Sequence, residues 1–295
     1  MSYNYKIFTD TSSNLPTPML RELGIEVIPF TYHVGDEAQS CLDTTAFDGD
    51  AYYASLRSGV RVTTSQIAPQ TYMEAFTPVL EGGEDVIYVS MSSGISGSCN
   101  SARIAAGELK ELYPARTVRV VDTLAASLGE GIVVLRAAEL RDAGTELARA
   151  AEELDILSRR VCQIFTVDDL MHLRRGGRLS NISAVVGTVL QIKPLLMGNE
   201  EGKIISIAKI RGRKHSVEAL ADKYDALVEA PETQTVGIAH AGCREDVDYL
   251  VSLLNRNKPP KDILVVDYEP MTGAHVGPGA LALFFVGRDD VRSTR

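Results

Sequence analysis

The chain has 295 residues, which is long enough for two domains. Its 39 acidic residues outnumber its 30 basic ones and give a net charge of -9, which disfavours nucleic acid as a partner. The four cysteines form no C-x-x-C pair, so we expect reduced thiols, no metal site and no cofactor. The sequence contains neither a signal peptide nor an apolar segment of about 20 residues. We therefore expect a cytoplasmic protein with no transmembrane segment.

Short apolar runs alternate with helical patterns through the first half of the chain. The predicted strands cover residues 5–8, 25–34, 85–91 and 117–122. The predicted helices cover residues 65–80, 99–112, 125–143 and 145–159, the last with Thr145 as its N-cap. This alternation predicts an α/β fold with a mostly parallel, Rossmann-like sheet and helices on both faces.

The pattern changes after residue 160. An apolar run at 161–167, a helical stretch at 185–191 and two runs at 194–197 and 203–210, separated by the turn-like GNEEG, indicate antiparallel pairing. Helices at 215–229 and 244–254 and strands at 235–241, 262–268 and 281–287 complete an α+β unit. We expect an N-terminal domain at 1–160 and a C-terminal domain at 161–295, with a ligand at their interface.

The stretch SMSSGISGSCNSA, residues 90–102, joins a predicted buried strand to a helix. Ligands bind at the carboxyl ends of strands in open α/β sheets, and a helix start offers free N–H groups. Glycines and serine hydroxyls at this point favour a small anionic group. Helix capping explains the same serines without any ligand, so both interpretations stay open.

A serine hydrolase is the alternative function. The nucleophile elbow of such enzymes has the pattern G-x-S-x-G, and here Ser98 occupies the position of the last glycine after Gly94 and Ser96. A nucleophile elsewhere in the loop would need a general base, and the sequence alone does not place His240 or His275 against it.

Other stretches carry polar groups of the same kind. RVTTSQIAP at 61–69 and DTSSN at 10–14 are further hydroxyl-rich loops, which favours one polar site at a common sheet edge. GAHVGPGALA at 273–282 lacks the strand and helix of a dinucleotide site, so we expect a tight loop that presents His275. The basic stretch HLRRGGRLS at 172–180 is either a solvated surface or the entrance for an anion.

Six stretches taken together resemble the DegV family. They are FTDTSSNLP, TTSQIAP, SSGISGSCNSA, VDTLAASLGEG, LRRGGRLSNISAVVGTVLQIKPLL and GAHVGPGALA, in this order over nearly the whole chain. The resemblance implies a two-domain protein that holds a long-chain fatty acid in a tunnel. It also implies a partner, a separate ATP-binding fatty acid kinase subunit similar to dihydroxyacetone kinase, which makes acyl phosphate for phospholipid synthesis. This chain would then be a lipid-binding carrier with no catalytic residue of its own.

The resemblance also assigns residues. The threonine of the family's T-S-Q motif matches Thr64 and the second serine of its S-S-G motif matches Ser93, and both would bind the carboxylate. His275 matches the histidine of H-x-G-P-G and would orient Ser93 or the carboxylate. Ser65 and Gly94 would lie near the head group, and Arg178, which matches the arginine of G-G-R, near the mouth of the site or the kinase contact.

Overall fold

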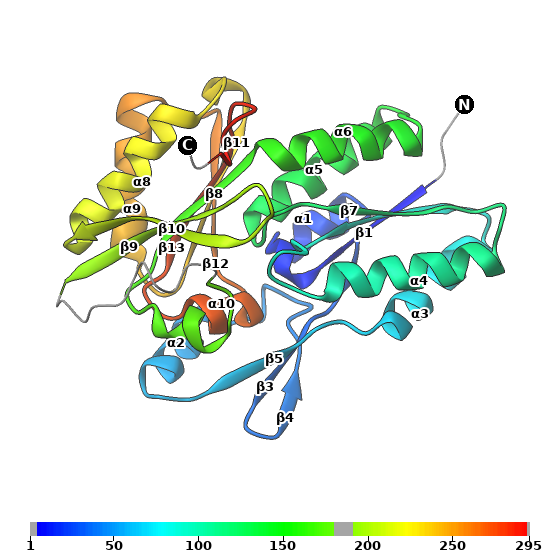
Figure 1. The fold of residues 1–295 in the computed structure, drawn as a ribbon, viewed down its shortest axis with the longest axis horizontal. Helices are drawn as coiled ribbons and strands as arrows, with labels where there is room; N and C mark the ends of the chain where they lie inside the picture. Colours follow the sequence, from blue (N-terminus) through cyan, green and yellow to red (C-terminus); the bar gives the residue numbers. More distant parts are fainter. Residues whose placement is uncertain (1–4, 180–190, 294–295) are drawn as a thin grey trace.

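The computed structural model describes residues 5–179 and 191–293 (Figure 1). Its first half is built on a parallel sheet with the strand order β2-β1-β6-β7. The strands are β1 (Tyr5–Asp10), β2 (Glu26–Ile28), β6 (Asp85–Ser90) and β7 (Val118–Asp122). The flanking helices are α3 (Pro69–Glu81), α4 (Ser98–Leu112), α5 (Leu128–Asp142) and α6 (Leu147–Arg160).

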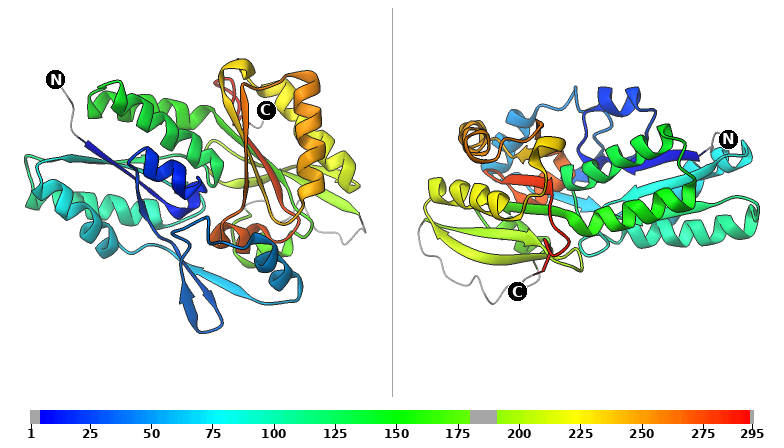
Figure 2. Two further views of the ribbon diagram at one scale, coloured as in Figure 1. Left: turned by 180° about the vertical axis from the view of Figure 1, so that it is seen from behind. Right: turned by 90° about the horizontal axis from the view of Figure 1, so that it is seen from above.

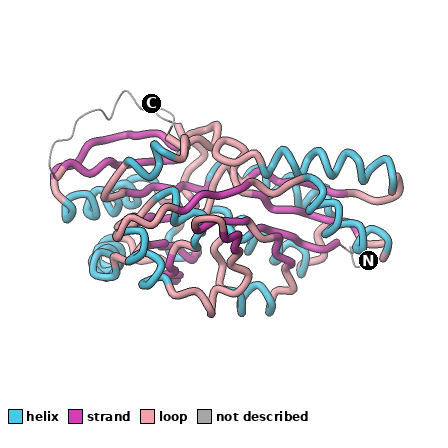
Figure 3. The backbone as a smooth tube through the Cα atoms, turned by 90° about the horizontal axis from the view of Figure 1, so that it is seen from below, coloured by secondary structure: helices cyan, strands magenta, loops and turns pink. Residues whose placement is uncertain are grey.

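Helices cover both faces of this sheet, as predicted (Figure 3). Successive side chains of a strand point to opposite faces. Ile7 and Ile87 therefore pack in one core cluster with α5, while Phe8 and Tyr88 pack in another with α3 and α4. The α/β fold class with a parallel first sheet is confirmed.

A small antiparallel sheet, β4-β3-β5, projects from this unit (Figure 1). This segment contains α1 (Thr17–Glu22), β3 (Thr31–Val34), β4 (Glu37–Gln39), α2 (Gly49–Arg57) and β5 (Val62–Ser65). The single strand predicted at 25–34 is wrong, because β2 and β3 belong to different sheets and Pro29 between them has no N–H for a ladder. The helix predicted at 65–80 begins only at Pro69, since residues 62–65 form β5.

The second half is built on a six-stranded sheet with the order β10-β9-β8-β13-β11-β12. Its strands are β8 (Val161–Thr166), β9 (Ile192–Gly198), β10 (Ile204–Arg211), β11 (Thr235–His240), β12 (Asp262–Asp267) and β13 (Leu281–Val286). Its helices are α7 (Met171–Arg175), α8 (Arg213–Leu227), α9 (Arg244–Asn257) and α10 (Pro270–Val276). The antiparallel pair β9–β10 around the GNEEG turn is confirmed. The helix predicted at 185–191 lies, but for its last residue, outside the described residues.

The two sheets lie side by side along the longest axis of the molecule (Figures 1 and 2). One core cluster spans both, since it joins Ile7 and Val89 of the first sheet to Phe165 and Phe284 of the second. The change of sheet falls at Val161, next to the boundary expected at residue 160. The assignment of two domains stays a prediction. No helix within the described ranges is both long and apolar enough to cross a membrane.

Asn14 links the two halves. Its backbone has a φ of 59°, in the left-handed region, and its amide nitrogen donates to the carbonyl of Asp267 at 2.8 Å. Its amide oxygen accepts from the hydroxyl of Ser127 at 3.0 Å and from the backbone N–H of Glu269 at 3.2 Å. One buried side chain thus bonds the starts of α5 and α10 and the end of β12.

We expect Asn14→Ala to lower the free energy of unfolding by about 2 to 4 kcal/mol, because it leaves buried donors without acceptors. Urea unfolding of the whole chain measures this loss. Asn100→Ala, at an exposed position of α4, is the matched control and should change little. Equal stability of the two variants would show that Asn14 does not join the halves.

Candidate functional site

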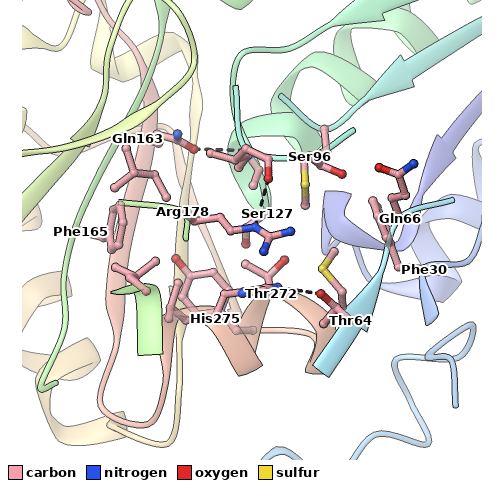
Figure 4. A pocket seen from close by; sticks show the side chains of 18 of the residues that line it. Phe30, Thr64, Gln66, Ser96, Ser127, Gln163, Phe165, Arg178, Thr272 and His275 are labelled. Atoms are coloured by element: carbon pink, nitrogen blue, oxygen red, sulfur yellow. Dashed lines mark hydrogen bonds between the residues drawn. The ribbon is translucent and has the colours of Figure 1, made fainter. Parts of the chain in front are cut away.

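A cavity lies where the loops of the first sheet meet β8, β13 and α10 (Figure 4). It encloses about 870 Å³, its open mouth included. Its apolar lining includes Phe30, Met91, Ile95, Phe165, Leu173, Ile204, Met271, Val276 and Phe284. Its polar lining includes Thr64, Ser65, Gln66, Ser96, Ser127, Gln163, Arg178, Thr272 and His275. The cavity therefore combines a long apolar wall with a group of neutral donors and one guanidinium.

Thr64 and His275 form a hydrogen-bonded pair in this cavity. The distance from Thr64 Oγ1 to His275 Nε2 is 2.8 Å, although 211 positions separate the residues in the sequence (Figure 4). Thr64 lies on β5 of the projecting sheet, and His275 lies in the last turn of α10. The projecting segment thus completes the site by bringing Thr64 to the second half of the chain.

The surroundings of His275 fix its ring. It was expected on a tight loop, but it lies on α10, because Glu269 caps this helix by accepting from the N–H groups of Met271 and Thr272. Gly176 lies against the ring, since a Cβ at that position would come within 2.5 Å of His275 Nδ1. A glycine is needed there for α7 to approach α10 so closely.

His275 is neutral at physiological pH. Burial, together with the smaller effect of the positive charge of Arg178, lowers the pKa of its imidazole to about 4. A neutral imidazole accepts or donates one hydrogen bond at Nε2, so it can orient the hydroxyl of Thr64 without adding a charge to the site.

We expect NMR titration of the imidazole to show His275 neutral at pH 6, and Arg178→Gln to raise its pKa. Since the pKa in the folded state lies below that of an unfolded histidine, the folded state binds fewer protons between pH 4 and about pH 6.5. The contribution of His275 to stability is therefore lost as the pH falls through this range. A wild-type His275 that titrates at its ordinary pKa would contradict the burial of its ring.

Arg178 reaches into the middle of the cavity from the segment after α7 (Figure 4). Its Nε donates to the carbonyl of Ile95 at 3.3 Å, and its Nη1 donates to the carbonyl of Gly176. Neither partner is a carboxylate, so the positive charge of the guanidinium is left for a ligand. Arg174 and Arg175 of the same basic stretch are exposed and do not line the cavity.

The structure places Ser93 outside this cavity. Ser93 is exposed, does not line the cavity, and its backbone N–H donates to the carboxylate of Asp122 at 3.1 Å. Ser96 of the same loop lines the cavity instead (Figure 4). Its hydroxyl accepts from the N–H of Ser98 at 3.2 Å and lies 3.1 Å from the Ser98 hydroxyl.

Of the two residues expected near the head group, one lines the cavity and the other does not. Ser65 lines the cavity, and its hydroxyl lies 3.1 Å from Nε2 of His33. Gly94 does not line the cavity, because it packs against the backbone of Glu201 and Gly202 in the β9–β10 turn. Of the six expected positions, Thr64, Ser65, Arg178 and His275 are brought together, whereas Ser93 and Gly94 are not.

The hydroxyl-rich stretch at 10–14 does not line the cavity. Its side chains are buried: Ser12 donates to the carboxylate of Glu130, and Thr11 accepts from the N–H of Phe30 at 3.0 Å. Burial, strengthened by the charge of Asp10, raises the pKa of Glu130 well above its ordinary value. The hydroxyl of Ser12 therefore bonds to a buried carboxyl group of the protein itself.

Sequence reasoning missed Thr272 and Gln163. Thr272 is buried and lines the cavity, where its hydroxyl lies close to the carboxyl group of Glu269. Gln163 is a polar side chain in the apolar run VCQIFTV, and that contrast was the signal that could have singled it out. The aromatic lining gave no signal, because Phe165 and Phe284 look like any core residues.

Comparisons with known proteins identify the family of this chain. A family model described as an uncharacterised protein, DegV family, matches residues 4–288. A DegV domain-containing protein of Clostridium perfringens is 35% identical over 283 residues, which cover 96% of this chain and 97% of that protein.

Two solved structures share the fold. A DegV family protein from Thermus thermophilus, described by its fatty acid binding, has a TM-score of 0.86 and 30% identity over 97% of this chain and 100% of its own. DegV of Bacillus subtilis, described as a fatty acid binding protein, has a TM-score of 0.82 and 26% identity over 97% of this chain and 100% of its own. Sequence and structure thus match over nearly the full length, and the chain belongs to the DegV family.

Proposed function

We propose that this chain binds one long-chain fatty acid, with its hydrocarbon tail inside the cavity and its carboxylate among Thr64, Ser96 and Arg178. The cavity itself carries the proposal, because it joins an apolar wall to hydroxyls and a guanidinium. The likeness to the Thermus thermophilus and Bacillus subtilis fatty acid binding proteins supports it. We also propose that the protein lies in the cytoplasm, because its four cysteines are free thiols, as is usual in a reducing compartment.

The tail supplies most of the affinity. Burying the fourteen methylenes of hexadecanoic acid has a gross transfer free energy of about 11 kcal/mol, at roughly 0.8 kcal/mol each. Lost motion of the ligand and ordering of side chains offset a large part of this gain. The residues that supply the apolar contacts come from both halves of the chain, so the tail lies at their interface.

The head group supplies orientation. Hydrogen bonds from hydroxyls to a carboxylate are charge-assisted, and they mainly replace the water that the carboxylate loses. Thr64, whose hydroxyl contacts the neutral imidazole of His275, donates to one oxygen, and Arg178 supplies the positive charge. Ser96 and Thr272 supply further hydroxyls, so Ser96 takes the role that the sequence assigned to Ser93.

We further propose that the bound acid is presented to a separate ATP-dependent kinase subunit. A carboxylate oxygen held mainly by neutral donors stays ionised and can attack the γ-phosphorus of ATP. A new P–O bond forms, the bond to the β-γ bridging oxygen breaks, and acyl phosphate and ADP result. This chain contributes binding and orientation, and the kinase subunit contributes the nucleotide site.

Native mass spectrometry of the protein after incubation with hexadecanoic acid tests the binding. We expect one acid per chain, and no adduct at all would overturn the proposal. For the presentation step, ATP-dependent acyl phosphate formation is measured with a dihydroxyacetone-kinase-like subunit. Ser96→Ala should lower the rate, whereas Ser93→Ala should leave it unchanged.

The geometry does not favour the serine hydrolase. A serine nucleophile needs a histidine within hydrogen-bond reach and a third group that orients that histidine. Among the described residues, His275 bonds to Thr64 and to no serine, and although the hydroxyl of Ser65 lies 3.1 Å from Nε2 of His33, no third group bonds to the other ring nitrogen of His33 to orient it. Release of product from an activated ester by the chain alone would restore this alternative.

A further inference from the structure

One polar side chain stands in the apolar wall on the side of the cavity away from Thr64. Gln163 lies in the middle of β8, is only 5% exposed and lines the cavity beside Phe165 and Phe284. Figure 4 places it across the cavity from Thr64 and Gln66. A hydrocarbon tail gives an amide nothing to bond to, so a polar group at this position needs an explanation.

The orientation of the Gln163 amide is fixed by a backbone group. Its Oε1 accepts from the N–H of Ala126 at 3.1 Å, and a backbone N–H bonds only to the oxygen end of an amide. The nitrogen end therefore points away from Ala126. The amide nitrogen Nε2 carries two N–H groups that can donate. Within the described ranges, neither of them has a hydrogen-bond acceptor.

A buried guanidinium lies close to the Gln163 amide. Gly198 packs against both groups, since a Cβ at that position would lie 2.5 Å from Gln163 Nε2 and 3.1 Å from Arg292 Nη1. Arg292 is 3% exposed, and its Nη1 donates to the carbonyls of Leu124 and Asn199. Its Nε and Nη2 find no partner among the described residues.

Arg292 places a positive charge behind this end of the cavity, although it does not line the cavity itself. Burial lowers the pKa of Arg292 to about 10, so the guanidinium keeps its charge at neutral pH. It forms no ion pair with a carboxylate of the described chain. A donor without an acceptor is unfavourable inside a protein, so the unpaired amide nitrogen of Gln163 favours a ligand that brings an acceptor.

We propose that the inner end of the cavity is a second polar subsite, which takes an oxygen carried on the tail of an oxygenated fatty acid and bonds it to the amide nitrogen of Gln163. The subsite rests on the proposed function, because the tail must first enter the cavity. A hydroxyl or a keto oxygen meets the requirement for an acceptor. A plain hydrocarbon tail leaves the amide unpaired, and a site with a buried polar group discriminates against a ligand that lacks the matching atom.

The test compares octadecanoic acid with its hydroxy and oxo derivatives at carbons 10, 12 and 17, by competition against a fluorescent acid. We expect at least one oxo acid to bind roughly threefold to tenfold more tightly than octadecanoic acid. The oxo acids are the decisive ligands. A keto oxygen accepts hydrogen bonds but cannot donate them, so it can pair only with a donor such as the amide nitrogen of Gln163. If no derivative binds more tightly, water fills the subsite and the proposal is wrong.

Gln163→Met should abolish this preference, because methionine has a similar length and no donor. Gln163→Glu is the second variant, since it keeps an acceptor for Ala126 and removes the amide donors. Phe165→Leu, which alters the same wall without changing its polarity, should keep the preference. A preference that survives both Gln163 variants would overturn the proposal. Failure of every acid to bind, octadecanoic acid included, would instead overturn the proposed function.

Discussion

Thr64→Val should weaken fatty acid binding by roughly tenfold to hundredfold. The substitution keeps the shape of the side chain and removes the hydroxyl, which contacts His275 and which we propose as a charge-assisted donor to the carboxylate. The loss concerns the head group, so it should be similar for acids of every chain length. Titration of the purified variant with hexadecanoic acid measures it.

Thr63→Val is the matched control. Thr63 precedes Thr64 on β5, is exposed and does not line the cavity. We expect its affinity to equal that of the wild type. Equal affinities for both variants would remove Thr64 from the head-group site, and equal losses would point to a general effect on β5.

Ala126→Phe should abolish the binding of long-chain acids while the protein stays folded. Ala126 is 7% exposed and lines the cavity next to Gln163 and Phe284, so an aromatic ring there occupies space that the tail needs. The loss should exceed a hundredfold for hexadecanoic acid, because several methylenes lose their burial at about 0.8 kcal/mol each. Octanoic acid, which has fewer methylenes to place, should lose much less.

The melting temperature without ligand separates blocking from unfolding. A ring that enters existing space costs little or stabilises the fold, whereas overpacking costs about 1 to 3 kcal/mol. Ala115→Phe, at an exposed position after α4, is the matched control and should bind as the wild type does. Unchanged binding of hexadecanoic acid to Ala126→Phe would place the tail outside this cavity.

Much of the site could be predicted from the sequence, because hydroxyl-rich loops at the carboxyl ends of strands follow a general rule of α/β sheets. The T-S-Q and S-G-S stretches and Arg178 all contribute to the cavity. The rule could not say which hydroxyl of a loop faces inward. Ser93 and Ser96 differ only in the backbone path of the loop, which depends on the packing of Gly94 against the β9–β10 turn.

The remaining features depend on contacts between distant segments. Thr64 meets His275 only because the projecting segment crosses to the second half of the chain, where Tyr53 donates to the carbonyl of Tyr268 at 2.5 Å. Stretch 10–14 looks like the other hydroxyl loops, but its Ser12 bonds to Glu130, which lies far along the sequence. The apolar lining is equally hidden, since a cavity wall and a filled core use the same residue types.

A crystal structure of the protein with hexadecanoic acid tests the central claim most directly. We expect a carboxylate oxygen at hydrogen-bond distance from Thr64 Oγ1, about 2.5 to 3.0 Å, with the guanidinium of Arg178 beside it. The tail should run between Phe165 and Phe284 toward Gln163. An acid bound at another surface, with this cavity closed by its own side chains, would contradict the account.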